Sequence, residues 1–103
     1  MQYPLDDKGN LKNLADWDTP CLYWFAEQEA ISVTSEHLDV IQFFRDFYVQ
    51  YSLTPSMRVL LKFLRTRWST EKVSSTYLQQ LFPKSVMLQA SRLAGLPKPT
   101  RCL

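Results

Sequence analysis

The chain has 103 residues, of which 46% are hydrophobic and 14% aromatic, so it can build one domain around a single core. Its formal net charge is +2, and no apolar run approaches the ~20 residues that cross a bilayer. The amino terminus also lacks the basic start and apolar stretch of a secretory signal, so we expect a cytoplasmic protein with no membrane contact. Two cysteines, Cys21 and Cys102, are too few for a disulfide framework.

Charge is distributed unevenly along the chain. Residues 1–51 hold three basic and nine acidic side chains, a net charge of −6, whereas residues 52–103 hold nine basic side chains and Glu71, a net charge of +8. The two halves can neutralise each other within the fold, or the basic half can form a face for an acidic partner such as a nucleic acid.

The amino-terminal segment has the pattern of a small β-hairpin. Apolar residues flank the turn-forming run Asp-Lys-Gly-Asn, in which Gly9 can adopt a positive φ without penalty. A helix is predicted next, within residues 16–31, because Asp18 or Thr19 can cap it and Pro20 suits the first helical position.

Two helices are predicted in the middle of the chain. Thr34 or Ser35 can cap the first, and Thr54 is the expected cap of the second, which Pro55 opens. The apolar face of the first helix is formed by Val40, Ile41, Phe44, Phe47, Tyr48 and Tyr51. The side chains of the second helix expected to face the core are Met57, Leu60, Leu61, Leu64 and Trp68.

Two shorter helices are predicted before the tail. The first, within residues 76–82, is stopped by Pro83, and the last, within residues 85–94, ends at Gly95, where a left-handed cap is expected. The whole pattern predicts a mainly α domain with a small amino-terminal β-hairpin.

The last eight residues, 96–103, form a proline-containing tail. Pro97 and Pro99 fix φ and push the residues before them out of the helical region, so the tail is expected to be an extended arm of roughly 25 Å at ~3.1 Å per residue. Cys102 would lie near its end, where a thiolate can enter another protein's active site. The terminal carboxylate opposes thiolate formation, whereas Arg101 opposes the carboxylate. The alternative is a disordered chain end with an incidental cysteine.

No other pattern indicates a metal or cofactor site. His37 is the only histidine and has no partner at metal-ligand spacing, so we expect it at the surface or as a cap of its helix. Cys21 lies among apolar residues in the first turn of a helix, where a packed small hydrophobic side chain is favoured over a reactive thiol.

A basic stripe follows the second central helix, with Arg58, Lys62 and Arg65 on one face and Arg67 nearby. Two helices joined by a short turn outline a helix–turn–helix nucleic-acid-binding or regulatory module, although the stripe contains no Asn or Gln to read adenine. A solvated face is one interpretation, and docking onto an acidic protein or a tRNA backbone is another.

The tail "QASRLAGLPKPTRCL" resembles the signature of the TusE/DsrC family, which ends in Q-A-x-[KR]-x-A-G-L-P-K-P-x-x-C-x. "SEHLDVIQFFRDFYVQY", "TPSMRVLLKFL" and "TYLQQLFP" are similar to the central helices of that family and to the stretch before its last helix. The resemblance implies one domain over residues 1–103, an orthogonal helical bundle with an amino-terminal hairpin and a mobile carboxy-terminal arm at residues 96–103.

The resemblance also implies a sulfurtransferase that needs no cofactor. TusE-type members accept a persulfide on the penultimate cysteine from the TusBCD complex. They present it to the thiouridylase MnmA, with or without bound tRNA, which makes 2-thiouridine at the tRNA wobble position. Carried onto this chain, the persulfide carrier is Cys102, supported by Arg101, Lys98 and Arg92. The docking face is expected to include Arg58, Lys62 and Arg65.

Position 91 separates the two branches of the family. Members that serve dissimilatory sulfite reductase carry a second cysteine eleven positions before the last one, where this chain has Ser91. The resemblance therefore favours the TusE type over a partner of sulfite reductase, and Arg101 in place of a glycine agrees with this. The chain departs from the family pattern at Ser85-Val86 and in residues 72–78, which lack the usual glycine and arginine.

Overall fold

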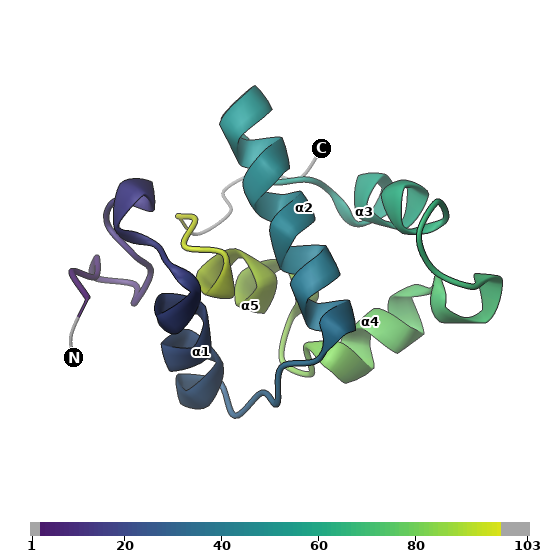
Figure 1. The fold of residues 1–103 in the computed structure, drawn as a ribbon, viewed down its shortest axis with the longest axis horizontal. Helices are drawn as coiled ribbons and strands as arrows, with labels where there is room; N and C mark the ends of the chain where they lie inside the picture. The colour runs from purple at the N-terminus through teal and green to yellow at the C-terminus, as the bar shows by residue number, and fades with distance from the viewer. Residues whose placement is uncertain (1–2, 98–103) are drawn as a thin grey trace.

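The structure is a computed structural model that describes residues 3–97. This part of the chain forms a mainly helical bundle, with no helix long and apolar enough to span a bilayer (Figure 1). Its elements, in chain order, are the 3-10 helix η1 (Leu14–Asp16), α1 (Thr19–Gln28), α2 (Ser35–Tyr51), α3 (Met57–Leu64), the 3-10 helix η2 (Thr70–Lys72), α4 (Ser75–Leu81) and α5 (Val86–Leu93). The predicted helices are confirmed.

Helix α5 is the central element of the bundle and packs against α1, α2 and α4 (Figure 1). Its Ala90 and Ser91 are fully buried, and their small side chains let neighbouring helices approach the α5 backbone. The large side chains that complete the core come from every α-helix or its flank and include Leu22, Phe25, Ile41, Phe44, Leu60, Leu64, Leu78, Phe82 and Leu93.

Each of the five α-helices begins at a side chain that accepts a hydrogen bond from the first-turn backbone, and these caps are Asp18, Thr34, Ser56, Ser74 and Ser85. The predictions at Asp18 and Thr34 are confirmed. The cap of α3 is Ser56 and not Thr54, because the Ser56 hydroxyl accepts from the Val59 N–H at 3.2 Å. Helix α3 therefore begins at Met57, after Pro55.

His37 is buried at the start of α2, with 4% of its surface exposed. Its Nδ1 accepts the Thr34 backbone N–H at 3.0 Å, and its Nε2 lies 2.8 Å from the Leu81 carbonyl oxygen. With Nδ1 as the acceptor, Nε2 is the ring nitrogen that donates to Leu81. The expected capping role is confirmed, whereas a surface position is wrong, because the ring joins α2 to the end of α4.

The structure corrects the predicted amino-terminal β-hairpin. Residues 3–97 contain no strand, and the pairing is a single antiparallel bridge between Leu5 and Leu11. Gly9 has the expected positive φ of 81° in the turn. The pairing does not lengthen because Pro4 has no N–H to donate and Asn13 already caps η1.

The carboxy-terminal end of α2 projects beyond the rest of the bundle (Figure 1). Val40, Ile41 and Phe44 are buried as predicted, but Tyr51 is 53% exposed. Helix α2 has 17 residues, or about 25 Å at 1.5 Å per residue, and α3 and α5 have only eight residues each. The last turn of α2 therefore has no core to pack against.

Candidate functional site

The described chain ends at Pro97, so Cys102, Arg101 and Lys98 lie outside the described residues. What the structure places is the base of the arm, residues 93–97, where α5 ends and the tail begins. The other thiol, Cys21, is fully buried in α1, and this burial raises its pKa to about 11. Cys21 is therefore a core side chain, as expected from its neighbours.

Gly95 ends α5 in the predicted left-handed cap, with φ of 74°. The Gly95 N–H donates to the Arg92 carbonyl at 3.1 Å, and the Leu96 N–H donates to the Ser91 carbonyl at 2.9 Å. This pair of bonds is a Schellman motif. A Cβ on Gly95 would lie 2.5–3.0 Å from atoms of Trp17, so the site also requires glycine for space.

Three side chains from separate parts of the chain hold carbonyl groups of the arm base. Trp17 Nε1 donates to the Leu93 carbonyl at 2.8 Å, and Arg45 Nη1 donates to the Ala94 carbonyl at 2.7 Å. Asn10 Nδ2 donates to the Leu96 carbonyl at 3.1 Å. Together with the Schellman bonds, these contacts give a hydrogen-bond donor to each backbone carbonyl from residue 91 to residue 94 and to that of Leu96. They also determine where the chain leaves the bundle.

Leu96 belongs to the body of the protein, although the arm was expected to begin there. Its side chain is fully buried in the core cluster, and its backbone bonds to both Ser91 and Asn10. Pro97 is the first exposed residue after α5.

Arg45 is the charged member of these contacts. Its guanidinium lies 3.9 Å from the centre of the Trp17 ring, a cation–π geometry. Burial lowers the pKa of Arg45, since desolvation opposes its charge, but an arginine stays charged at neutral pH. Sequence reasoning missed Arg45, Trp17 and Asn10; the one available signal is that Arg45 is a basic residue within an otherwise acidic helix.

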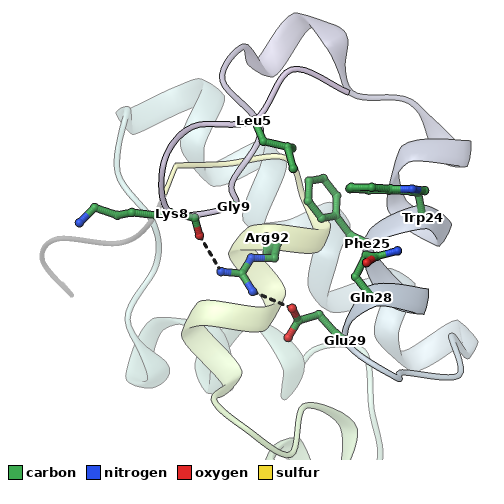
Figure 2. Close-up of a pocket in the computed structure, with 8 residues that line it drawn as sticks. All are labelled: Leu5, Lys8, Gly9, Trp24, Phe25, Gln28, Glu29 and Arg92. Atoms are coloured by element: carbon green, nitrogen blue, oxygen red, sulfur yellow. Dashed lines mark hydrogen bonds and ion pairs between the residues drawn. The ribbon is translucent and has the colours of Figure 1, made fainter. Parts of the chain in front are cut away.

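Arg92 lines a cavity of about 240 Å³ (Figure 2). Other residues that line this cavity are Leu5, Trp24 and Phe25. Its Nη1 donates to Glu29 at 2.6 Å, and its Nη2 donates to the Lys8 carbonyl at 3.1 Å. Figure 2 shows the guanidinium reaching from α5 between the amino-terminal turn and α1. Arg92 thus has a structural role next to the arm base, and its expected support of a bound sulfur remains a prediction.

Glu29 is the carboxylate that holds Arg92. Burial alone would raise its pKa, but hydrogen bonds from Gln89 at 3.0 Å and from Arg92 outweigh burial and lower it. Glu29 is therefore ionised at neutral pH, and its ion pair with Arg92 joins the end of α1 to α5.

The three residues expected to dock a partner are placed elsewhere. Arg58, Lys62 and Arg65 are exposed on α3, which Figure 1 shows on the far side of α2 from α1. None of their side chains forms an ion pair or hydrogen bond with a residue in the range 3–97. The structure thus separates the basic stripe from Arg92.

Ser91, at the position that separates the two branches of the resemblance, is fully buried in α5. Its hydroxyl has no hydrogen-bond partner among residues 3–97. A serine cannot form a disulfide, so this position offers no second thiol.

The comparisons with known proteins agree with one another. The family model described as "DsrC like protein" matches residues 1–103. Sulfurtransferase TusE of Escherichia coli K12 is 42% identical over 98 residues, covering 95% of this chain and 90% of that protein. The NMR structure of DsrC from Allochromatium vinosum is 42% identical with a TM-score of 0.86, covering 100% of this chain and 92% of that one. The oxidized gamma-subunit of the dissimilatory sulfite reductase (DsrC) from Archaeoglobus fulgidus is 30% identical with a TM-score of 0.89, covering 100% and 94%.

Proposed function

Since the chain belongs to the DsrC-like protein family, we propose that it is a sulfur-relay protein, a sulfurtransferase that carries sulfur as a persulfide on Cys102. One observation supports this above the others: 95% of the chain aligns at 42% identity with a curated TusE sulfurtransferase. The chain has two cysteines, and because Cys21 is buried in the core, Cys102 is the candidate carrier.

The proposed chemistry is sulfur exchange between thiols. The Cys102 thiolate attacks the outer sulfur of a donor cysteine persulfide, the donor S–S bond breaks, and the donor leaves as a thiolate. Cys102 now holds the persulfide. In the second step an acceptor thiolate attacks the outer sulfur, a new S–S bond forms on the acceptor, and Cys102 leaves as a thiolate. The carrier is regenerated and no external oxidant or reductant is consumed.

The arm base supports this role through geometry. The carbonyls of Leu93, Ala94 and Leu96 are held from three directions, so the chain leaves the bundle at a defined point. Cys102 is the fifth residue after Pro97, and five residues at ~3.1 Å each in an extended chain would reach roughly 16 Å. That reach lets the thiol enter two different active sites in turn without rearrangement of the body.

We propose a TusBCD-type complex as the donor and an MnmA-type tRNA thiouridylase as the acceptor, with 2-thiouridine at the tRNA wobble position as the product. The similarity to TusE supports this branch. A role as a partner of sulfite reductase is the alternative, and similarity to DsrC structures favours it. Ser91 argues against that alternative, because the position eleven residues before Cys102 holds no cysteine and the other cysteine, Cys21, is buried in the core.

Intact-mass spectrometry tests the proposal. The unaltered chain, Cys102→Ser and Cys21→Ser are each incubated with a persulfide donor. We expect the unaltered chain and Cys21→Ser to gain one sulfur and Cys102→Ser to gain none. Gain of sulfur by Cys102→Ser together with its absence in Cys21→Ser would reject the proposal.

A further inference from the structure

A groove lies between α2 and α3, and no residue of the arm base lines it. It has a volume of about 400 Å³, and its lining residues include Phe43, Phe47 and Tyr51 from α2 and Val59, Lys62 and Phe63 from α3. The Phe43 and Phe63 rings stack with centres 4.1 Å apart. This stack is an aromatic contact between the two helices. Within α2, the centres of the Phe47 and Tyr51 rings are 4.6 Å apart. Apart from Lys62, which the resemblance places in the docking face, the proposed sulfur exchange on Cys102 involves none of these residues.

Apolar surface is exposed at the open end of this groove. Tyr51 is 53% exposed on the projecting last turn of α2, and Leu53, just after that turn, is 38% exposed. Isolated exposed apolar residues are ordinary, but Tyr51 lines a groove that is itself aromatic. Contiguous aromatic surface of this kind is typical of a protein contact.

The two rims of the groove differ in charge. The α3 rim carries Lys62, with Arg58 and Arg65 one turn away on either side, and these cations have no side-chain partner among residues 3–97. By contrast, Arg67, Lys72 and Arg92 each form an ion pair. The α2 rim carries the acidic Asp46 and the neutral Gln50.

We infer that this groove binds an amphipathic helix of a protein partner in the relay, one whose apolar ridge is flanked by Asp or Glu on the side that meets α3. The inference rests on the proposed function, since it takes the partner from the donor or acceptor of sulfur. The apolar ridge fits the aromatic lining, and the acidic flank complements the cations of α3. A nucleic acid fits less well, because its phosphates would also face Asp46.

Such a contact explains how the arm can be used productively. The groove is lined by none of the residues that hold the arm base, Asn10, Trp17 and Arg45, so a partner at the groove leaves those contacts intact. The docked partner raises the local concentration of Cys102 at its active site, and the arm supplies only the reach.

Binding of purified partners by titration calorimetry tests the inference. All chains carry Cys102→Ser, so that no sulfur moves and docking is measured without chemistry. Lys62→Glu is compared with Lys12→Glu, an exposed lysine outside the groove that gives the same net charge. Tyr51→Ser is compared with Tyr23→Ser, since Tyr23 is 49% exposed on α1. The probes are a TusBCD-type complex, an MnmA-type enzyme and a tRNA transcript.

We expect Lys62→Glu and Tyr51→Ser each to raise the Kd of at least one protein partner about tenfold, and the two controls to change it by less than about twofold. Equal binding by groove variants and controls would overturn the inference. So would weaker binding of tRNA alone by Lys62→Glu, which would make the surface an RNA contact. Failure of the proposed function looks different, because the unaltered chain would then take no persulfide or bind neither protein.

Discussion

The guanidinium of Arg45 lies 3.9 Å from the centre of the Trp17 ring while its Nη1 donates to the carbonyl of Ala94. Trp17 in turn donates from Nε1 to Leu93. The pair therefore joins the segment before α1, the middle of α2 and the end of α5, close to the end of the described chain. Because both donors act on adjacent carbonyls, we expect a change in either residue to alter the position of the arm base.

Replacement of Arg45 by methionine tests this contact. Arg45→Met keeps much of the side-chain volume but removes the charged donor and the cation–π contact, and we expect it to lower the free energy of unfolding by about 2 kcal/mol. Urea denaturation measures the effect. Arg58→Met, on the exposed face of α3, is the matched control and should change stability by less than about 0.5 kcal/mol. Equal stability of the two variants would mean that the contact contributes nothing.

Substitutions at two residues with left-handed backbone, Ala30 and Gly95, should change the stability of the fold in opposite directions. Ala30 ends α1 with φ of 57°, where a Cβ is strained, so Ala30→Gly should raise the free energy of unfolding by about 0.5–1 kcal/mol. Gly95 has φ of 74°, and a Cβ there would also meet Trp17, so Gly95→Ala should lower it by more than about 1 kcal/mol. Thermal unfolding of both variants provides the measurement. A stabilised Gly95→Ala would contradict the described end of α5.

The lowered pKa of Glu29 predicts acid sensitivity. A carboxyl whose pKa is lower in the folded than in the unfolded state stabilises the fold above its unfolded pKa and loses that effect as the pH falls through its folded pKa. The unfolded chain binds more protons in this window, so the free energy of unfolding should fall on acidification from about pH 5 downwards.

Comparison of Glu29→Gln with Glu27→Gln isolates this contribution. Glu29→Gln should be less stable than the unaltered chain at pH 7 and should lose less stability between pH 5 and pH 3. Glu27 is exposed on the same helix, and Glu27→Gln should follow the unaltered profile. Superimposable pH profiles for the two variants would contradict the role of the Glu29–Arg92 pair.

Burial raises the pKa of Cys21 to about 11, which predicts selective thiol chemistry. At pH 8 iodoacetamide should modify Cys102 in the native protein and leave Cys21 unmodified, because only a thiolate that the reagent can reach reacts. In urea both cysteines should react. Peptide mass mapping distinguishes the two sites, and rapid native labelling of Cys21 would show that α1 does not shield it.

Local features of the fold could be predicted from the sequence. Asp18 and Thr34 are recognised as caps because the first turn of a helix needs nearby acceptors, and Gly95 is recognised because a left-handed end favours glycine. The apolar residues on either side of a turn-forming run predict a hairpin, but Pro4 and the early start of η1 limit the pairing to one bridge. That limit depends on two neighbours of the turn and not on the turn itself.

The candidate site could be predicted only in part. Cys102 stands out because of its prolines and its place in the chain, whereas the residues that hold the arm base do not. Asn10, Trp17 and Arg45 lie 86, 76 and 49 positions from the carbonyls they contact. Such pairs arise from how the helices pack, and no local spacing in the sequence indicates them.

Transfer of labelled sulfur from donor to tRNA tests the central claim most directly. A TusBCD-type donor loaded with ³⁵S is mixed with this protein, an MnmA-type enzyme and a tRNA transcript, and label in the tRNA is measured over one turnover. We predict that the unaltered chain and Cys21→Ser pass the label on and that Cys102→Ser does not. Label reaching tRNA at the full rate through Cys102→Ser would contradict a carrier role for this thiol.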